Sequence, residues 1–331
     1  MDNILDIIIP HYKESKEMLD NALNSISIQE GIDFRNINVI IVNDCGNPIL
    51  DDDLKIKYKK LNIVYLSNEI NLGPGLTRQR GLNASMAKYV TFLDCDDEFN
   101  SNFALANVID RMEQYKDNVL VTSIIEEVFI NGKSFIFKHM PNEIQGLHGI
   151  FYNREYLVNN NIKFHSELWH CEDSYFYRIS TYITKIDAID FVTYKWNYNE
   201  NSIVRQKREL DYSVVAFKDH LNQIQFTYDF VKEKGCAYGD EFLNDYLIQS
   251  LLGLHILLRS VYFDGEELEK DKIEYEKKLK EIYQKYKDVF DKAGIDKLTR
   301  LFKSEFNSLS STNPKIRKPS SIIKFIELLK E

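Results

Sequence analysis

The apolar positions in the first part of the chain gather in short continuous runs. Such runs are typical of strands that are covered on both faces of a parallel sheet. They lie at residues 4–9, 37–42, 62–66, 89–93 and 119–125. Between them, apolar residues recur at helical spacing, most clearly over 15–29 and 103–115. Strands alternating with helices predict βαβ units with right-handed crossovers, and therefore an α/β fold whose sheet is mostly parallel.

The pattern becomes helical beyond Arg208. One apolar face runs over 243–261 and a second over 275–289, where Gly294 follows as a stop. A short amphipathic segment lies at 322–329. These helical faces exceed what a single sheet needs for its cover. We therefore expect two parts, which are an α/β domain over 1–208 and a helical region over 209–331.

Three carboxylates follow the run at 89–93, namely Asp94, Asp96 and Asp97. Open α/β sheets bind ligands at the carboxyl ends of their strands. Crowded carboxylates repel one another, so a cation or bound donor groups must hold them together. Their oxygens suit Mg²⁺ or Mn²⁺. The alternative is an acidic loop that caps a helix starting near Asn100 or Ser101.

A glycine-bearing turn lies between the third and fourth runs. Asn71, Gly73 and Gly75 precede a helical segment that carries Arg78 and Arg80. Backbone N–H groups at such a turn can bind phosphate, and arginines can add charge-assisted hydrogen bonds. An ordinary turn followed by a helix with exposed arginines is the alternative interpretation.

The composition describes a globular protein, with 44% hydrophobic and 28% charged residues. The net charge of −9 argues against a nucleic-acid partner. The four cysteines are far apart and lack the spacing of a zinc site, which predicts reduced thiols. The first apolar run is too short for a signal peptide, and no run is long enough to span a membrane. We expect a cytoplasmic protein, with the inner face of the membrane as a further location.

Several motifs in order resemble the family 2 glycosyltransferases of GT-A fold. They are Ile7-Ile8-Ile9-Pro10-His11-Tyr12-Lys13-Glu14, Asp44 after the second strand, Asn71-x-Gly73 leading to Arg78-Gln79-x-Gly81-Leu82, and Phe92-Leu93-Asp94-Cys95-Asp96-Asp97. The likeness extends through 148–157 to His170-Cys171-Glu172-Asp173. It implies a GT-A domain in which a nucleotide sugar binds at the strand ends.

The resemblance also implies a role for each donor-site residue. Tyr12 would stack near the base beside Pro10 and Glu14. Asp44 would accept the uracil N3–H, which indicates a UDP-sugar. Asp94 would contact the ribose or the metal, and Asp96 would bind the Mn²⁺ or Mg²⁺ that bridges the diphosphate. The remaining donor-site residues are Asn71, Gly73 and Arg78.

Asp173 would be the general base, with Glu172 beside it as a second catalytic candidate. The alternative for this pair is ordinary negative charge at a helix N-terminus, which the helix dipole favours. His148, His165 and His170 lie near the expected acceptor side. One of them could be a third metal ligand, although hydrogen-bonded or surface histidines are more common.

The segment 194–205 resembles the strand and polar flap that often close the GT-A core, and Asn201 or Arg205 could contact the diphosphate. A hairpin exit with exposed polar groups fits this segment equally well. Two positions depart from the family pattern. Cys95 replaces a serine or alanine between the aspartates, and Gln79 stands where asparagine is usual.

These features predict an inverting, metal-dependent hexosyl- or N-acetylhexosaminyltransferase. It would act on a hydroxyl-bearing acceptor, such as a glycan or a cell-envelope polymer. The helical region would shape the acceptor site or form a homo-oligomer. One alternative is a sugar-phosphate nucleotidyltransferase, but its Gly-x-Gly-Thr-Arg start is missing. Another is a non-catalytic nucleotide-sugar-binding or scaffold module.

Overall fold

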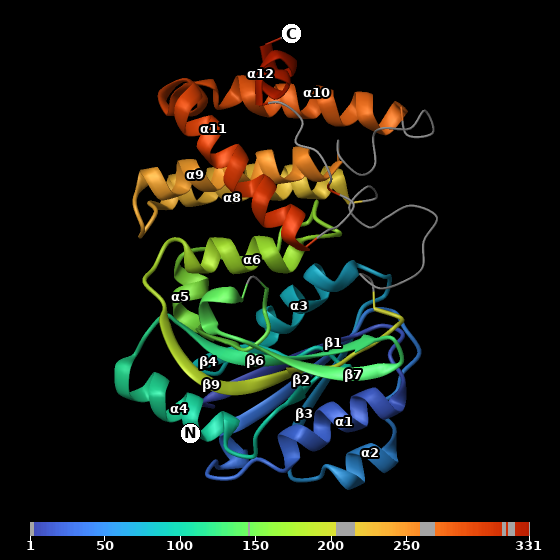
Figure 1. Cartoon of the computed structure of the whole chain (residues 1–331). Helices are drawn as coiled ribbons and strands as arrows, with labels where there is room; N and C mark the ends of the chain where they lie inside the picture. Colours follow the sequence, from blue (N-terminus) through green and yellow to red (C-terminus); the bar gives the residue numbers. More distant parts are fainter. Residues whose placement is uncertain are drawn as a thin grey trace. The chain divides into compact units, whose positions relative to one another are not determined.

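The computed structural model describes residues 3–144, 146–202, 216–258, 269–312, 316 and 322–330. The chain divides into two compact units, Met1–Gln206 and Lys207–Glu331. The first unit contains the sheet and the second is helical (Figure 1). The boundary that we predicted at residue 208 lies outside the described residues.

The first unit is built on a nine-stranded mixed sheet in the order β3-β2-β1-β4-β8-β6-β9-β5, with β7 paired to β6. The strands are β1 (Leu5–His11), β2 (Ile37–Asn43), β3 (Asn62–Ser67), β4 (Tyr89–Phe92), β5 (Glu98–Phe99), β6 (Val119–Ile130), β7 (Lys133–His139), β8 (Ile150–Asn153) and β9 (Asp187–Trp196). The first four strands in sequence are parallel to one another. Their carboxyl ends therefore share one edge, as the predicted βαβ units require.

Helices flank this sheet (Figure 1). They are α1 (Lys16–Ser27), α2 (Asp52–Lys57), α3 (Gly73–Ala84), α4 (Ala104–Tyr115), α5 (Arg154–Asn159) and α6 (Glu172–Thr181). Helix α3 packs closely on the sheet, since a Cβ atom on Gly81 would lie only 2.5 Å from Cγ2 of Ile8. This close approach holds the C-terminal part of α3 directly against β1. The α/β fold predicted from the apolar runs is confirmed.

The hairpin of β6 and β7 was not predicted. Strand β6 continues past the expected end at residue 125 to Ile130, and it turns through Asn131 and Gly132, whose φ angles are 50° and 77°. An Asn-Gly pair is the usual signature of such a turn. The outer part of the hairpin exposes apolar side chains, namely Phe129, Ile130, Phe135, Ile136 and Phe137.

The second unit contains α8 (Phe217–Lys234), α9 (Asp240–Leu257), α10 (Glu269–Lys285), α11 (Lys287–Thr312) and α12 (Ile322–Lys330). The predicted helical character is confirmed, and its apolar faces are buried at Leu243, Leu247 and Tyr275. Gly294 interrupts α11 with a φ of 69°, where we expected a helix end. None of the helices among the described residues combines the length and apolar character that crossing a bilayer requires.

Candidate active site

The carboxylate cluster lies in a tight turn between β4 and β5. Leu93 still pairs with Ile8 of β1, and the N–H of Asp97 then donates to the carbonyl of Asp94 over 3.0 Å. The turn therefore presents three aspartates at the carboxyl edge of the parallel strands, where the sequence placed them. Asp97 is almost fully buried, whereas the side chain of Asp94 keeps 28% of its surface exposed.

Asp94 lies between two cationic groups. Its Oδ1 accepts a hydrogen bond from Nη2 of Arg78 at 2.7 Å, and its Oδ2 is 3.5 Å from Nε2 of His148. Burial opposes ionisation of Asp94, but the charges of Arg78 and His148 outweigh it and hold its pKa well below the usual range. Burial also disfavours the charged form of His148 and lowers its pKa, but the contact with Asp94 outweighs burial, so that the pKa of His148 is raised overall. The ring of His148 stacks on Trp196 at 4.9 Å between centroids.

Asp96 and Asp97 are held by the end of β9 and the residues that follow it. Asp97 accepts from the hydroxyl of Tyr194 at 2.6 Å and from the N–H of Asn197 at 2.8 Å, and Asp96 accepts from Nδ2 of Asn199 at 2.7 Å. Burial raises the pKa of both carboxyls, and the neighbouring aspartates add to the rise. The asparagines were not predicted as site residues, although they lie inside the segment 194–205. Arg205 lies outside the described residues.

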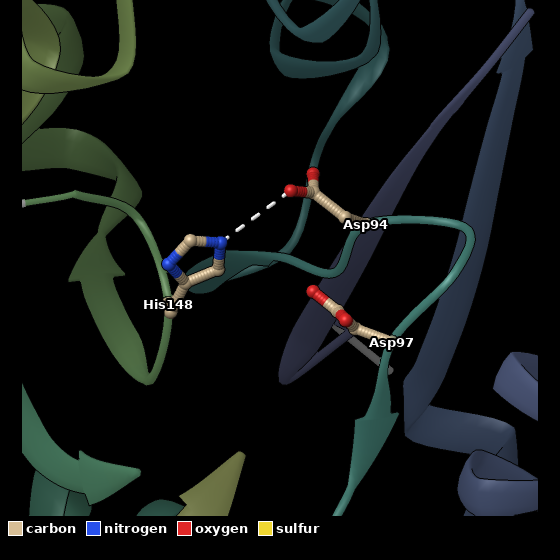
Figure 2. A group of neighbouring side chains, drawn as sticks. All are labelled: Asp94, Asp97 and His148. Carbon is tan, nitrogen blue, oxygen red and sulfur yellow. Dashed lines mark ion pairs between the residues drawn. The ribbon is translucent and has the colours of Figure 1, made fainter. Parts of the chain in front are cut away.

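One group of side chains could hold a metal ion among the described residues. Ligand atoms of Asp94, Asp97 and His148 all lie within 4.8 Å of one another, and the side chains point toward one another (Figure 2). Two carboxylates and an imidazole suit a divalent ion such as Mn²⁺. The raised pKa of Asp97 is also what crowding of buried carboxylates without a cation produces. The residues therefore fit a metal.

This group overlaps only in part with the metal ligands predicted from the sequence. Asp94 belongs to both sets, but Asp96 accepts a hydrogen bond from Asn199 and is not in the group. Of the three histidines considered, the group includes His148 and neither His165 nor His170. The assignment of Asp96 as a ligand stays a prediction.

Arg78 joins this cluster to the start of α6. Its Nη1 donates to Oε1 of Glu172 at 2.9 Å, while Nη2 binds Asp94. The arginine is only 7% exposed, and its buried Nε has no hydrogen-bond partner within the part of the chain that the structure describes. Burial disfavours the guanidinium charge, but the two carboxylates outweigh burial and raise the pKa of Arg78. The sequence predicted that Arg78 faces the nucleotide, and the structure shows that it bridges two acidic groups.

Glu172 and Asp173 begin α6, as expected. Cys171 precedes them in the left-handed conformation, with a φ of 60°. Glu172 is buried against α3, because a Cβ atom on Gly75 would lie 2.8 Å from its Cγ. Asp173 is less buried, and its Oδ1 accepts from the N–H of Ser174 at 2.6 Å. Asp173 is therefore the more accessible carboxylate of the pair.

Asp44 fixes the glycine turn before α3. Its carboxylate accepts from Nδ2 of Asn68 at 2.7 Å, from the N–H of Leu72 at 2.8 Å and from the N–H of Gly73 at 2.9 Å. Asn71 also accepts from Gly73, whose φ of 82° suits glycine. Asp44 is only 3% exposed. If Asp44 also accepts the uracil N3–H, as predicted, its carboxylate must do so in addition to the hydrogen bonds that it already accepts from the protein.

The segment after β1 lies closer to solvent. The N–H of Tyr12 donates to Oε2 of Glu14 at 2.7 Å, and the Tyr12 residue is 36% exposed. Pro10 is the next-to-last residue of β1 and pairs with Val42 of β2. An exposed ring at the end of a central strand is available for stacking, which is compatible with the predicted base contact.

We expect Glu172 to make stability depend on pH. Burial and the charge of Asp173 raise the pKa of Glu172 from 4.5 to about 7 despite Arg78. The folded protein therefore keeps a proton that the unfolded chain loses between these values, and stability falls as pH rises from 4.5 to about 7. The loss from this group is roughly 3 kcal/mol at most. Unfolding in urea at several pH values measures it.

Glu172→Gln is the matched control, because the amide can still accept from Arg78 but does not titrate. The difference in unfolding free energy between wild type and Glu172→Gln should change steadily across this pH range. A constant difference would show that Glu172 does not titrate there.

The mostly parallel sheet with flanking helices is a fold of GT-A type. The chain belongs to glycosyl transferase family 2, because residues 6–174 match that family. A processive diacylglycerol beta-glycosyltransferase of Mycoplasma genitalium is 30% identical over 168 residues, which are 49% of this chain and 46% of that protein. The chain thus matches about half the length of this relative.

Solved structures agree in fold. TarS of S. aureus (residues 1–349) superposes with a TM-score of 0.66 at 17% identity, over 94% of this chain and 92% of that chain. It has also been solved with UDP-GlcNAc. The mannosyltransferase PcManGT of Pyrobaculum calidifontis, solved with GDP-Man and Mn²⁺, gives a TM-score of 0.51 at 13% identity, over 95% and 89% of the two chains. At these identities the likeness shows the fold alone.

Proposed function

We propose that this protein transfers a hexosyl or N-acetylhexosaminyl unit from a UDP-sugar to a hydroxyl group of an acceptor, with inversion at the anomeric carbon. One observation carries the proposal. Arg78 joins Asp94, at the end of β4, to Glu172, which directly precedes the accessible carboxylate of Asp173. One buried ion-pair network thus joins the carboxylate cluster to the helix start that carries the candidate base.

The donor assignment rests on residues at the carboxyl edge of the sheet. Tyr12 would stack on the base, with Pro10 and Glu14 beside it. Asp44 would accept the uracil N3–H while it fixes the turn that holds Asn71 and Gly73. TarS, which has this fold, was solved with UDP-GlcNAc, and PcManGT, which also has it, was solved with GDP-Man. The choice of a uridine nucleotide therefore rests on the expected contact of Asp44 with N3–H.

Asp94, Asp97 and His148 would hold a divalent cation, with Asp96 as the further candidate from the sequence. When bound, the ion supplies positive charge for the diphosphate that leaves. This chain contributes the geometry of the site. Tyr194 and Asn197 fix Asp97, whereas Asn199 fixes Asp96.

Asp173 would accept the proton of the attacking hydroxyl. A carboxylate in this role must lie within hydrogen-bond reach of that hydroxyl, on the face of the sugar opposite the leaving UDP. Single displacement from that side inverts the anomeric centre. The helical unit would shape the acceptor site or form a homo-oligomer, as the excess of apolar helix faces suggests.

We expect the purified protein to release UDP from at least one of UDP-glucose, UDP-galactose and UDP-GlcNAc in the presence of Mn²⁺. Removing the cation with EDTA should weaken UDP binding, measured by calorimetry, by at least about tenfold, because crowded carboxylates and a diphosphate repel each other without it. Equal UDP affinity in Mn²⁺ and in EDTA would contradict the metal site.

Single Asp→Asn variants locate the cation. If Asp94, Asp97 and His148 hold the metal, Asp97→Asn should abolish the Mn²⁺ dependence of UDP binding. If Asp94 and Asp96 hold it, as the sequence predicts, Asp96→Asn should abolish that dependence. Asp53→Asn, on the exposed face of α2, is the matched control and should behave like wild type. Unchanged cation dependence in both site variants would place the metal elsewhere.

A further inference from the structure

Trp169 is an exposed aromatic residue at the edge of the candidate site. It is 49% exposed, although most large apolar side chains of this unit are buried. Its indole lies over the glycine turn before α3, since a Cβ atom on Gly73 would stand 3.1 Å from Cε3 and Cζ3 of the ring. Any larger residue at position 73 would therefore displace the indole. Glycine is therefore favoured at position 73 for two reasons, which are its positive φ and the close approach of the indole.

The loop that carries Trp169 is firmly anchored. The ring of Phe164 stacks on Phe176 of α6 with centroids 4.2 Å apart, and it meets Phe92 of β4 edge-on at 5.5 Å. The N–H of Phe164 donates to Oε1 of Gln79 at 2.9 Å, and Leu168 is buried. An aromatic ring that is held in place before binding loses little conformational entropy when a ligand stacks on it.

The position of this ring connects the two halves of the proposed reaction. Gly73, beneath the indole, is fixed by Asp44 on the donor side. Asp173, the proposed base, lies four residues after Trp169, at the start of the helix that packs against α3. The indole thus lies over the proposed donor turn, and its loop leads directly into the helix start that carries the proposed base.

We propose that Trp169 is the platform on which the acceptor stacks, and that the acceptor unit which carries the attacking hydroxyl is a pyranose ring. The inference rests on the proposed function and adds the class of acceptor. An indole presents a flat apolar face with a polar N–H at one edge. A pyranose matches it with a flat face of C–H groups and hydroxyls around the rim, whereas a linear polyol offers no such face.

Tryptophan fluorescence tests binding without turnover. The chain has two tryptophans, so Trp196→Phe leaves Trp169 as the only one. This variant, with UDP and Mn²⁺, is titrated with the methyl β-pyranosides of glucose, galactose, mannose and N-acetylglucosamine, and with sorbitol as the linear control. We expect a saturable change in emission with at least one pyranoside and none with sorbitol. No response to any pyranoside, or an equal response to sorbitol, would overturn the proposal.

Turnover provides the second measurement. The ratio of pyranoside-stimulated to acceptor-free UDP release should fall roughly tenfold in Trp169→Ala, and Trp169→Phe should restore most of it. Phe103→Ala, which removes a 50% exposed ring at the start of α4, is the matched control and should keep the wild-type ratio. An unchanged ratio in Trp169→Ala would exclude the platform.

The two hypotheses fail in different ways. If no UDP-sugar is turned over, the proposed function fails, while the fluorescence titration still reports whether Trp169 binds a pyranose. If UDP is released but Trp169→Ala weakens UDP-sugar binding as much as it lowers pyranoside stimulation, the ring belongs to the donor site. That result would overturn the acceptor assignment alone.

Discussion

Replacing Asp173 by asparagine is expected to lower kcat by about 10² to 10⁴, because a positioned general base typically contributes that much. Asparagine keeps the size of the side chain and can still accept from Ser174, so the start of α6 should remain intact. UDP affinity should change little, since the residue faces the acceptor in the proposed reaction. Steady-state kinetics and UDP calorimetry measure the two effects.

The anomeric configuration of the product provides an independent check on Asp173. Proton NMR of the product should show inversion, as a single displacement requires. A retained configuration would rule out this mechanism. If Asp173→Asn were fully active, the base would be a different group, and Glu172→Asn would be tested next.

Replacing Arg78 by methionine is expected to destabilise the first unit by about 3–5 kcal/mol, because removing one partner of a buried ion pair leaves uncompensated charge. Here two carboxylates lose their partner, and Asp94 and Glu172 are both largely buried. The length and apolar character of methionine preserve most of the packing. Urea unfolding at pH 7 measures the loss.

Two further variants show whether charge causes the loss in Arg78→Met. Arg111→Met removes a second arginine, which binds Asp187 at 2.8 Å on the sheet but keeps 30% of its side chain exposed, and it should cost much less. Adding Glu172→Gln to Arg78→Met should recover part of the stability, because without Arg78 the buried Glu172 must take up a proton at pH 7, whereas glutamine need not. Strict additivity of the two changes would argue that Arg78 acts mainly through packing.

The sequence was sufficient for the parallel part of the fold. Strands β1, β2 and β4 are buried runs, so their apolar character identifies them without tertiary information. Strand β3 lies at the sheet edge and is partly exposed, but its short apolar run still predicted it. Strand β6 is different, because its first half is buried and its second half runs from half-buried to exposed, and the buried run predicted only the first half. The Asn131-Gly132 turn was a local signal for the missing hairpin.

The candidate site was also predictable from the sequence only in part. Asp94, Glu172 and Asp173 lie in short motifs, and the structure places the first two on the same arginine. The contacts of Asp97 with Tyr194 and Asn197 join positions about a hundred residues apart in sequence. The hydrogen-bonding role of Asn199 depends on the same return of the chain. Such pairings arise from the position of β9 beside β5 and β6, which no local pattern specifies.

The shared arginine limits how this chain could be recombined with its relatives. Arg78 and Asp94 come from the part of the chain before β5, whereas Glu172 comes from a segment nearly eighty residues later. A chimera that joins one parent's donor half to another parent's acceptor half would cut this network between its members. We expect such chimeras to be most stable when the incoming half also supplies, at position 172, a side chain that can accept a hydrogen bond from Arg78. New acceptor specificities would then be easier to obtain by changing the loop between α5 and α6 than by exchanging whole halves.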